Sequence, residues 1–370
     1  MRKWHGWHCP SAHGRKGPRQ RETAMQAQDA TQLLEGVPLP LVLIGPDERI
    51  RAANAPAQRL FGAASVARHY VMAMRQPALL DAIEGAIRLD RPGRARYIIT
   101  GPSREVTYRA TVTPVRIHGE SCALCAFEDI TEQEQMGAIR RDFVANVSHE
   151  LRTPLTALLG FIETLQGAAR DDPAARSRFL GIMAREAGRM NRLVQDLLSL
   201  SRVESEERVR PKTPVDVTAV IGQAIAALRP MAEAAGVEIQ RQGEAGPILL
   251  PGDPDQLTQV FHNLIENAVK YGASGKLVTV GISRDPEGLA RLGPAVRIEV
   301  VDRGEGIDAI HLPRLTERFY RVDNHRSREK GGTGLGLAIV KHIVNRHRGR
   351  FLIESELGQG SRFIVTLPLA

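Results

Sequence analysis

The chain has 370 residues, 42% of them apolar and 4% aromatic, with a formal net charge of +8. This length is enough for two to four domains that each bury a core. The charge does not indicate a nucleic-acid-binding protein, because residues 1–25 hold six Arg or Lys side chains against one Glu and the rest is close to neutral. Three cysteines exclude a disulfide scaffold. No stretch has the roughly 18 to 20 apolar residues of a transmembrane segment, and no signal peptide is recognised, so we expect a cytoplasmic location, with peripheral membrane association as the alternative.

Residues 1–28 have no hydrophobic periodicity, and we expect a disordered basic tail there. A metal site built from its His and Cys side chains, and a true start at Met25, are the alternatives.

From 29 to 129, short strand-like runs surround a helical middle, which predicts an α+β module. Cys122 and Cys125 have redox-motif spacing, but their apolar strand favours buried structural thiols. The expected strands are 39–44, 48–52, 97–100, 106–116 and 122–127.

Two long helices are expected next. A capping box at 131–134 predicts the start of a helix that runs past Leu165, and Asp172 and Pro173 predict the start of a second. Each helix carries one apolar stripe, so the hairpin 130–206 cannot close a core alone, and we expect a homodimeric four-helix bundle. The stripes are Met136, Ile139, Phe143, Val147, Leu151, Leu155, Leu158, Ile162 and Leu165, then Phe179, Met183, Ala187, Met190, Val194, Leu197 and Ser201.

His149 is misplaced for a core histidine. It lies two residues from an apolar neighbour on either side, so at about 100° per residue it points roughly 200° away from the stripe, into solvent. Pro154 has no N–H, so the carbonyl of Glu150 loses its helical partner and the helix should bend. Thr153 shares the face of His149 and offers a hydroxyl that could orient a water. The pattern predicts a reactive imidazole beside a carboxylate; a surface histidine without a role is the alternative.

The segment 211–370 alternates helices and strands in an α/β manner, after a short linker at Pro211–Pro214. A helix opening at Asp253-Pro254 should bury one apolar face. Its other face presents amide oxygens that suit a Mg²⁺ ion already bound to phosphates, a lysine for a phosphate and a ring for stacking. A helix with an ordinary solvated face is the alternative. The candidate ligand-binding residues of this helix are Asn263, Asn267, Lys270 and Tyr271, with Asn267 as the metal ligand.

Two glycine-rich turns complete the expected site. At Asp302, Gly304 and Gly306 the glycines let the backbone approach a flat ligand, and a buried carboxylate could accept the amine of a purine. A charged stretch, Asn324 to Lys330, predicts a mobile lid. The glycines after it open a helix whose N–H groups and dipole favour phosphate. This loop is neither a Walker loop nor a dinucleotide fingerprint. Its candidate binding residues are Gly332, Thr333, Gly334, Leu335, Gly336 and Leu337.

Over about 143–367 these motifs, in their order, resemble the bacterial sensor histidine kinases. They are the H-box 143–155, the N-box 263–271, the glycine boxes 302–306, 331–337 and 358–360, and the F-box 317–319, which adds Phe319 to the candidate binding residues. The resemblance implies a dimeric phosphotransfer hairpin at 130–206 and an α/β sandwich ATPase domain of the gyrase and histidine-kinase type at 211–370. Residues 29–129 resemble a PAS domain.

The resemblance implies that ATP, with Mg²⁺, phosphorylates His149, that Glu150 accepts or orients its proton, and that the phosphoryl group passes to an aspartate of a response regulator. It also implies a regulator phosphatase in which Thr153 positions water, and a domain swing about a hinge at 202–214. The amino-acid sequences of the H-box and of residues 317–337 look most like those of the phosphate-regulon sensor kinases. A soluble PAS kinase with another stimulus, an ATP-driven conformational machine with the same nucleotide fold, and a silent scaffold are the alternatives.

Overall fold

The protein is described here by a computed structural model, which covers residues 32, 34–101, 104–117, 119–206, 209–289, 293–322 and 332–369. The expected basic tail, its His and Cys side chains, and the expected lid at 324–330 lie outside these residues. The chain forms two compact units, residues 1–142 and 143–370. No helix in the described part of the chain is long and apolar enough to cross a membrane.

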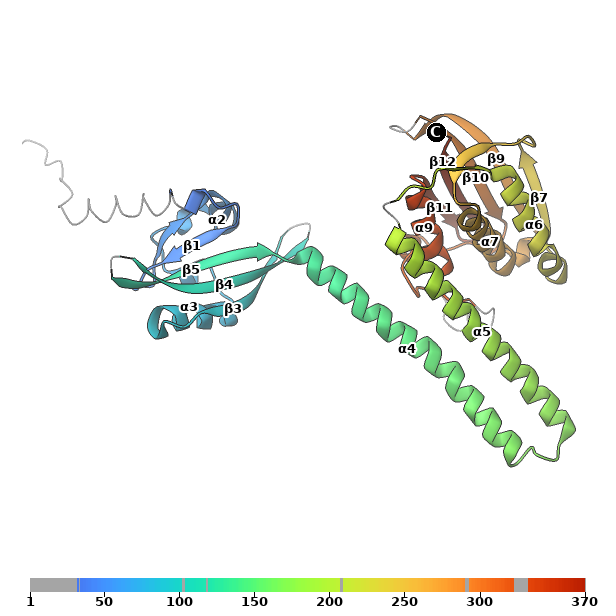
Figure 1. Ribbon diagram of the computed structural model, residues 1–370, viewed down its shortest axis with the longest axis horizontal. Helices are drawn as coiled ribbons and strands as arrows, with labels where there is room; N and C mark the ends of the chain where they lie inside the picture. The colour runs from blue at the N-terminus through green and yellow to red at the C-terminus, as the bar shows by residue number, and fades with distance from the viewer. Residues whose placement is uncertain are drawn as a thin grey trace, which may run out of the picture. The chain divides into compact units, whose positions relative to one another are not determined.

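A five-stranded sheet forms the framework of the first unit (Figure 1). Its strand order is β2-β1-β5-β4-β3, and every neighbouring pair is antiparallel. All five strands expected from the sequence are present, and the third begins four residues earlier than expected. The strands are β1 (Leu41–Ile44), β2 (Ile50–Ala53), β3 (Gly93–Thr100), β4 (Glu105–Ile117) and β5 (Glu120–Asp129).

One face of this sheet packs on short helices around an aromatic group. The rings of Phe61 and Tyr97 both lie against Phe127, with centroid distances of 5.0 and 5.7 Å. Cys125 is buried on this face, and Cys122 is buried on the opposite face. Burial raises the pKa of the Cys125 thiol to about 12, so it stays protonated. The prediction of buried strand cysteines is confirmed. The helices are α2 (Ala55–Phe61), η1 (Ala63–Ser65), η2 (Tyr70–Met72) and α3 (Pro77–Leu89).

Two long helices, α4 (Thr131–Gln166) and α5 (Pro173–Glu206), form the expected hairpin (Figure 1). Asp172 caps α5, because its Oδ1 accepts the N–H groups of Ala174 and Ala175 at 2.9 and 3.0 Å. The expected capping box at the start of α4 is wrong. Asp129 Oδ1 accepts both the N–H and the hydroxyl of Thr131, at 2.9 and 2.6 Å. That hydroxyl also accepts the N–H of Thr107, and Thr131 is already the first residue of α4, so Thr131 is not the residue that caps the helix.

The apolar stripes of the hairpin have only part of their surface covered within one chain. Pro154 is the only buried residue of α4, which continues through it to Gln166. On α5, Leu193, Leu200 and Val203 are buried in the core of the C-terminal part of the chain, a contact that the expected stripe did not include. Large apolar side chains remain exposed at Met136, Ile139, Leu155, Leu159, Ile162, Leu180, Val194 and Leu198.

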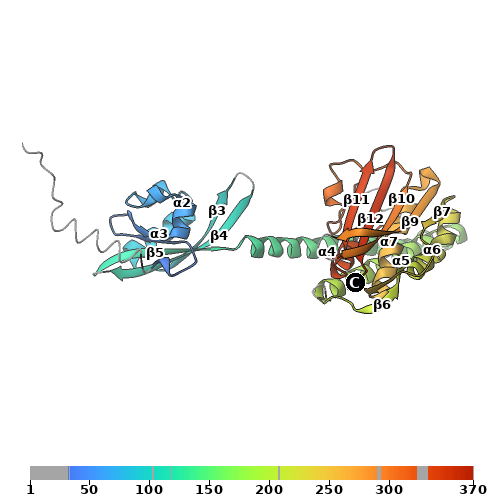
Figure 2. The same cartoon turned by 90° about the horizontal axis from the view of Figure 1, so that it is seen from above.

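The remainder of the second unit is a two-layer α/β sandwich, as expected. A five-stranded sheet with the order β11-β12-β10-β9-β7 packs one face against helices α6 (Val217–Ala234), α7 (Pro254–Tyr271) and α9 (Gly336–Arg346). Figure 2 shows this sheet with α6 and α7 beside it. All its pairs are antiparallel except β7 with β9. The other elements are β6 (Thr213–Asp216), β7 (Glu238–Gly243), β8 (Leu249–Gly252), β9 (Leu277–Leu289), β10 (Gly293–Asp302), β11 (Arg350–Glu356), β12 (Gly360–Pro368), η3 (Ala273–Gly275) and η4 (Leu312–Arg314).

The segment between α5 and β6 does not coincide with the linker expected at 211–214, and it is shorter than the hinge expected at 202–214. Helix α5 continues to Glu206, and Thr213 and Pro214 already pair with β8 as part of β6. A proline is compatible with an edge strand, where the missing N–H has no partner to lose, so Pro214 did not mark irregular structure. Regular structure therefore occupies both ends of the range 202–214, and the domain swing expected about that range stays a prediction.

Candidate active site

A cavity of about 520 Å³ lies between α7, the turn after β10, the loop before α9 and helix α5. Most of the residues expected to bind a ligand line it, although they come from segments up to 74 residues apart in the sequence. The α/β sandwich thus brings the separate motifs to one place. The expected residues that line the cavity are Asn263, Asn267, Lys270, Tyr271, Asp302, Gly306, Gly332, Thr333, Gly334, Gly336 and Leu337.

Helix α7 supplies one wall of the cavity. Its apolar face, which includes Leu264, Ile265 and Ala268, is fully buried, so its polar face must turn to the cavity. Lys270 Nζ lies 2.9 Å from Glu266 Oε1 one turn earlier. The side chains of this ion pair are 20% and 26% exposed, so a cation and an anion sit side by side in the cavity wall. An added phosphate group would compete with the carboxylate for this lysine.

Asp302 is the buried carboxylate of the site. It ends β10, is 5% exposed, and its Oδ1 accepts the N–H of Gly304 at 2.9 Å. Burial raises the pKa of Asp302, and the backbone N–H donors of Gly304 and Ser361 oppose that rise. A carboxylate held in this way keeps acceptor capacity for a donor that enters the cavity, such as an exocyclic amine.

The loop before α9 needs its glycine conformation. Gly334 has φ +73°, and a Cβ there would lie 2.9 Å from the Cα of Phe319, so a larger residue would strain the loop. The carbonyl of Gly334 accepts the N–H of Phe319 at 2.8 Å, which ties the F-box to the loop. Gly336 and Leu337 then begin α9 at the cavity wall, so the positive end of the helix faces the cavity.

Three expected binding residues do not line the cavity. Gly304 lies behind it, where a Cβ would come within 2.7 Å of the Cα of Gly272, so its role is close packing of two turns. Leu335 is fully buried in the core. Phe319 packs against Phe143 of α4, with ring centroids 5.9 Å apart. The sequence analysis expected every residue of these motifs to contact the ligand, but these three residues pack within the protein instead.

Several residues that were not expected also line the cavity, and two of them, Arg321 and Asp196, connect it to other parts of the chain. The side chain of Arg321 is 5% exposed, and its guanidinium donates to the carbonyl of Gly332 and lies 3.5 Å from Glu150 Oε2. Asp196 of α5 accepts the hydroxyl of Thr333 at 2.6 Å. Arg321 could have been suspected from the sequence, because it lies two residues after the F-box. Nothing in the sequence of α5 indicates that Asp196 belongs to the site.

His149 is exposed on α4, as the stripe predicts. Glu150 beside it is paired with Arg189 of α5, whose Nη2 lies 2.9 Å from Oε2. The Thr153 hydroxyl donates to the carbonyl of His149 at 3.2 Å, and its lone pairs still face solvent. The imidazole, the carboxylate and the hydroxyl therefore occur within one turn of the helix.

Comparison with known proteins assigns the same two regions to families. Residues 139–206 match the His Kinase A (phospho-acceptor) domain, and residues 252–370 match the histidine kinase-, DNA gyrase B- and HSP90-like ATPase domain. A phosphate regulon sensor protein, PhoR, of Pseudomonas aeruginosa is 42% identical over 252 residues, which are 67% of this chain and 54% of the relative. A sensor protein kinase, WalK, of Staphylococcus aureus is 41% identical over 245 residues, 66% of this chain and 57% of the relative.

The chain spans about half the length of these relatives. Among solved structures, the histidine kinase ThkA in complex with the response regulator protein TrrA is 20% identical, with a TM-score of 0.48, over 92% of this chain and 98% of that chain. The cavity and the exposed histidine lie in the two matched regions. The chain belongs to the bacterial two-component sensor histidine kinases.

Proposed function

We propose that this protein is an ATP-dependent histidine kinase that phosphorylates its own His149 and passes the phosphoryl group to an aspartate of a response regulator. The observation that carries the proposal is the combination, in one chain, of an exposed imidazole beside a carboxylate and a cavity lined by the motifs of a nucleotide site. Each half has a match to the corresponding family, over 139–206 and 252–370.

The reaction that fits these residues is an in-line phosphoryl transfer. A neutral imidazole nitrogen is nucleophilic near pH 7, so it can attack the γ-phosphorus. The N–P bond forms as the bond from phosphorus to the bridging oxygen breaks, ADP leaves with the electron pair, and Glu150 takes the proton of the imidazole. The main requirements are position and charge neutralisation, which cationic side chains and backbone amides can supply.

The cavity residues fit Mg²⁺–ATP as the bound nucleotide. Within the described residues no group of three His, Cys, Asp or Glu side chains forms a metal site of its own, so the ion would rely on phosphate oxygens and water. An amide oxygen such as that of Asn267 suits an ion already neutralised in this way. Lys270 would meet a phosphate, and Asp302 would accept the adenine amine. Tyr271, 39% exposed at the rim, would offer its ring for stacking.

Arg321 is the residue that we expect to connect the nucleotide with the reacting histidine. Its guanidinium lines the cavity and also reaches the carboxylate next to His149. A guanidinium binds phosphate and carboxylate oxygens with the same planar group. In the reaction it would exchange the Glu150 carboxylate for the γ-phosphate, which would release the carboxylate as the phosphoryl group approaches.

The active form is expected to be a homodimer. The exposed apolar side chains of the hairpin, such as Leu155 at 48% and Leu198 at 56% exposure, need a partner surface. A second hairpin of the same kind would complete a four-helix bundle. The match of 139–206 to the phospho-acceptor domain supports this assembly.

The N-terminal sheet unit is the expected sensor, and its strand order 2-1-5-4-3 with helices on one face is compatible with a PAS-type module spanning 29–129. The first regulator to test is one of the phosphate-regulon type, because PhoR of Pseudomonas aeruginosa is 42% identical. WalK of Staphylococcus aureus is nearly as similar at 41%, so regulators of that type belong in the same experiment.

Phosphotransfer profiling tests this function. The purified protein is labelled with γ-labelled ATP and mixed for a short time with each response regulator of its host. We expect rapid loss of label to one or two regulators. An ATP-driven conformational machine of the same nucleotide fold would instead hydrolyse ATP, retain no label on its own chain and transfer none, which would reject the proposal.

A further inference from the structure

We call the α/β sandwich formed by the elements from β6 to β12 the ATP-binding lobe. One face of helix α5 packs against this lobe along the last four turns of the helix. Leu193, Leu200 and Val203 enter the core of the lobe. Polar contacts run along the same face: Ser199 donates to Gln259 Oε1 at 2.7 Å, and Arg318 donates to Glu204 Oε1 at 2.5 Å. The helix and the lobe are therefore joined by a mixed apolar and polar interface, and a swing of the lobe relative to the hairpin must break it.

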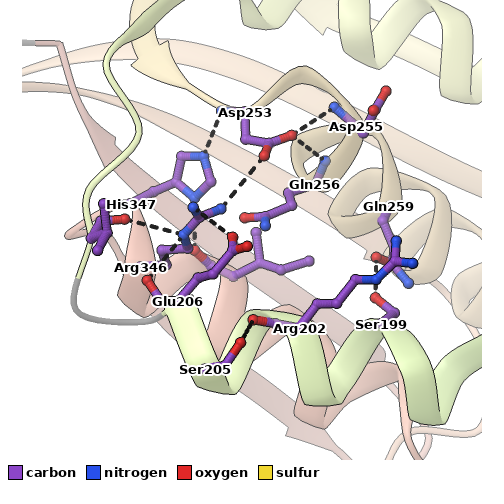
Figure 3. Close-up of polar contacts among 12 residues, drawn as sticks. Ser199, Arg202, Ser205, Glu206, Asp253, Asp255, Gln256, Gln259, Arg346 and His347 are labelled. Atoms are coloured by element: carbon purple, nitrogen blue, oxygen red, sulfur yellow. Dashed lines mark hydrogen bonds and ion pairs between the residues drawn. The ribbon is translucent and has the colours of Figure 1, made fainter.

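Arg346 holds the far end of this interface (Figure 3). Its side chain is 9% exposed, and its Nη2 lies 2.8 Å from Glu206 Oε2. Its Nε donates to the carbonyls of Glu206 and Val209 at 3.2 and 3.1 Å, and its Nη1 lies 3.5 Å from Asp253 Oδ2. One side chain from the end of α9 thus fixes the end of α5 to the start of α7.

Asp196 forms the other end of the interface, inside the cavity. Its carboxylate accepts the Thr333 hydroxyl at 2.6 Å, directly in the glycine loop expected to hold phosphates. Burial raises the pKa of Asp196, and Glu266 adds to the rise, while the Thr333 hydroxyl, Lys270 and Arg192 oppose it. An anion of the protein therefore lies where the proposed function, on which this inference rests, would place an anion of the ligand.

We propose that Asp196 senses the phosphates of the bound nucleotide and couples their binding to release of α5 from the lobe. A triphosphate that enters the glycine loop competes for the Thr333 hydroxyl and repels the carboxylate in a partly desolvated cavity. The repulsion weakens one end of the interface. Because coupling is reciprocal, the docked helix must in turn lower the affinity of the lobe for phosphate-bearing ligands.

The first test compares ligand affinities of the full chain at pH 8. Asp196→Asn keeps an oxygen that can accept the Thr333 hydroxyl but removes the charge. We expect the Kd for Mg²⁺ with a non-hydrolysable ATP analogue to fall at least threefold, and the Kd for adenosine, which carries no phosphate, to stay unchanged. Glu186→Gln is the matched control, because it makes the same charge change ten residues earlier on α5, about 15 Å along the helix.

The second test measures release directly. Nitroxides on Arg202→Cys of α5 and Lys341→Cys of α9, two exposed positions, report the distance between helix and lobe in a Cys9→Ser background. The native Cys122 and Cys125 are buried. We expect the ATP analogue to lengthen this distance in the parent protein, adenosine to leave it unchanged, and Asp196→Asn to abolish the response to the analogue.

The outcomes separate this inference from the proposed function. Analogue binding that Asp196→Asn leaves unchanged, or distances that move equally in parent and variant, would overturn the sensing role and leave the kinase proposal standing. Weaker analogue binding in Asp196→Asn would also overturn it, because Asp196 would then act as a metal ligand. Failure of the parent to bind either ligand would overturn both.

Discussion

Arg189 Nη2 of α5 lies 2.9 Å from Oε2 of Glu150, the residue that follows His149, and the two side chains are 15% and 17% exposed. The ion pair crosses the hairpin and fixes the carboxylate that we expect to accept the proton of the imidazole. Both side chains are largely covered, so the pair is less screened than one at the surface. The position of Glu150 therefore depends on the packing of α5 against α4.

Replacing Arg189 by Met tests this dependence. The variant keeps the length of the side chain but leaves Glu150 without its α5 cation, so we expect slower phosphorylation of His149, by about tenfold or roughly 1.4 kcal/mol in the barrier. Nucleotide affinity should not change, because Arg189 does not line the cavity. Arg185→Met, one turn earlier on α5, is the control. If His149 were phosphorylated at the same rate in Arg189→Met and in Arg185→Met, the ion pair between Arg189 and Glu150 would have no role in positioning the carboxylate for the reaction.

Thr153→Ala is expected to separate two activities. Loss of a hydroxyl that positions water should slow dephosphorylation of the regulator by about tenfold or more, equivalent to roughly 1.4 kcal/mol, while phosphorylation of His149 changes little. Thr164→Ala is a matched control, because that hydroxyl also donates to a carbonyl four residues earlier, at 2.7 Å. Both half-reactions can be followed with labelled phosphate. If both slowed equally, the phosphatase role of Thr153 would be withdrawn.

Asn267→Asp is expected to weaken binding of Mg²⁺–ATP by about tenfold, because a carboxylate changes the charge of a site suited to a neutral oxygen and adds repulsion toward phosphates. Titration with a fluorescent ATP analogue, with and without Mg²⁺, measures the effect. Asn345→Asp, an exposed position on α9, controls for the added charge. An unchanged dependence on Mg²⁺ would remove Asn267 from the metal site.

The fold was predictable where local patterns decide it. Strand alternation, the Asp172 cap and the buried face of α7 are local signals, and the structure confirms them. The Thr131 cap was wrong, because Thr131 is the first residue of the helix and its hydroxyl bonds Asp129 and Thr107 of the sheet instead. The docking of α5 and the position of Asp196 in the cavity depend on contacts between segments 137 residues apart, which no periodicity reveals.

His347 should make the ATP lobe sensitive to acid. Nδ1 lies 2.8 Å from the carbonyl of Ile343 and acts as donor, so Nε2 must accept the N–H of Asp253 at 3.0 Å (Figure 3). Burial lowers the pKa of His347 from its ordinary value of 6.5. Folding therefore favours the neutral form of His347. The stability that this form contributes is complete above about pH 6.5, the pKa of the unfolded chain, and is lost as the pH falls toward the lower pKa of the folded protein.

Thermal unfolding between pH 8 and pH 5 measures this contribution. We expect the parent protein to lose stability below pH 6.5, and His347→Gln to be less stable at pH 8 but to change less with pH. A parallel pH dependence in parent and variant would assign the acid sensitivity to other groups.

The most direct test of the account is phosphate incorporation from γ-labelled ATP by the parent protein and by His149→Gln. His69→Gln, in the N-terminal sheet unit, is the control for loss of a histidine. We expect the parent and the control to acquire label that is stable in base and lost in acid, as a phosphohistidine is. His149→Gln should acquire none while its affinity for nucleotide stays the same. Label on His149→Gln equal to that on the parent would contradict the assignment of His149 as the phosphorylated residue.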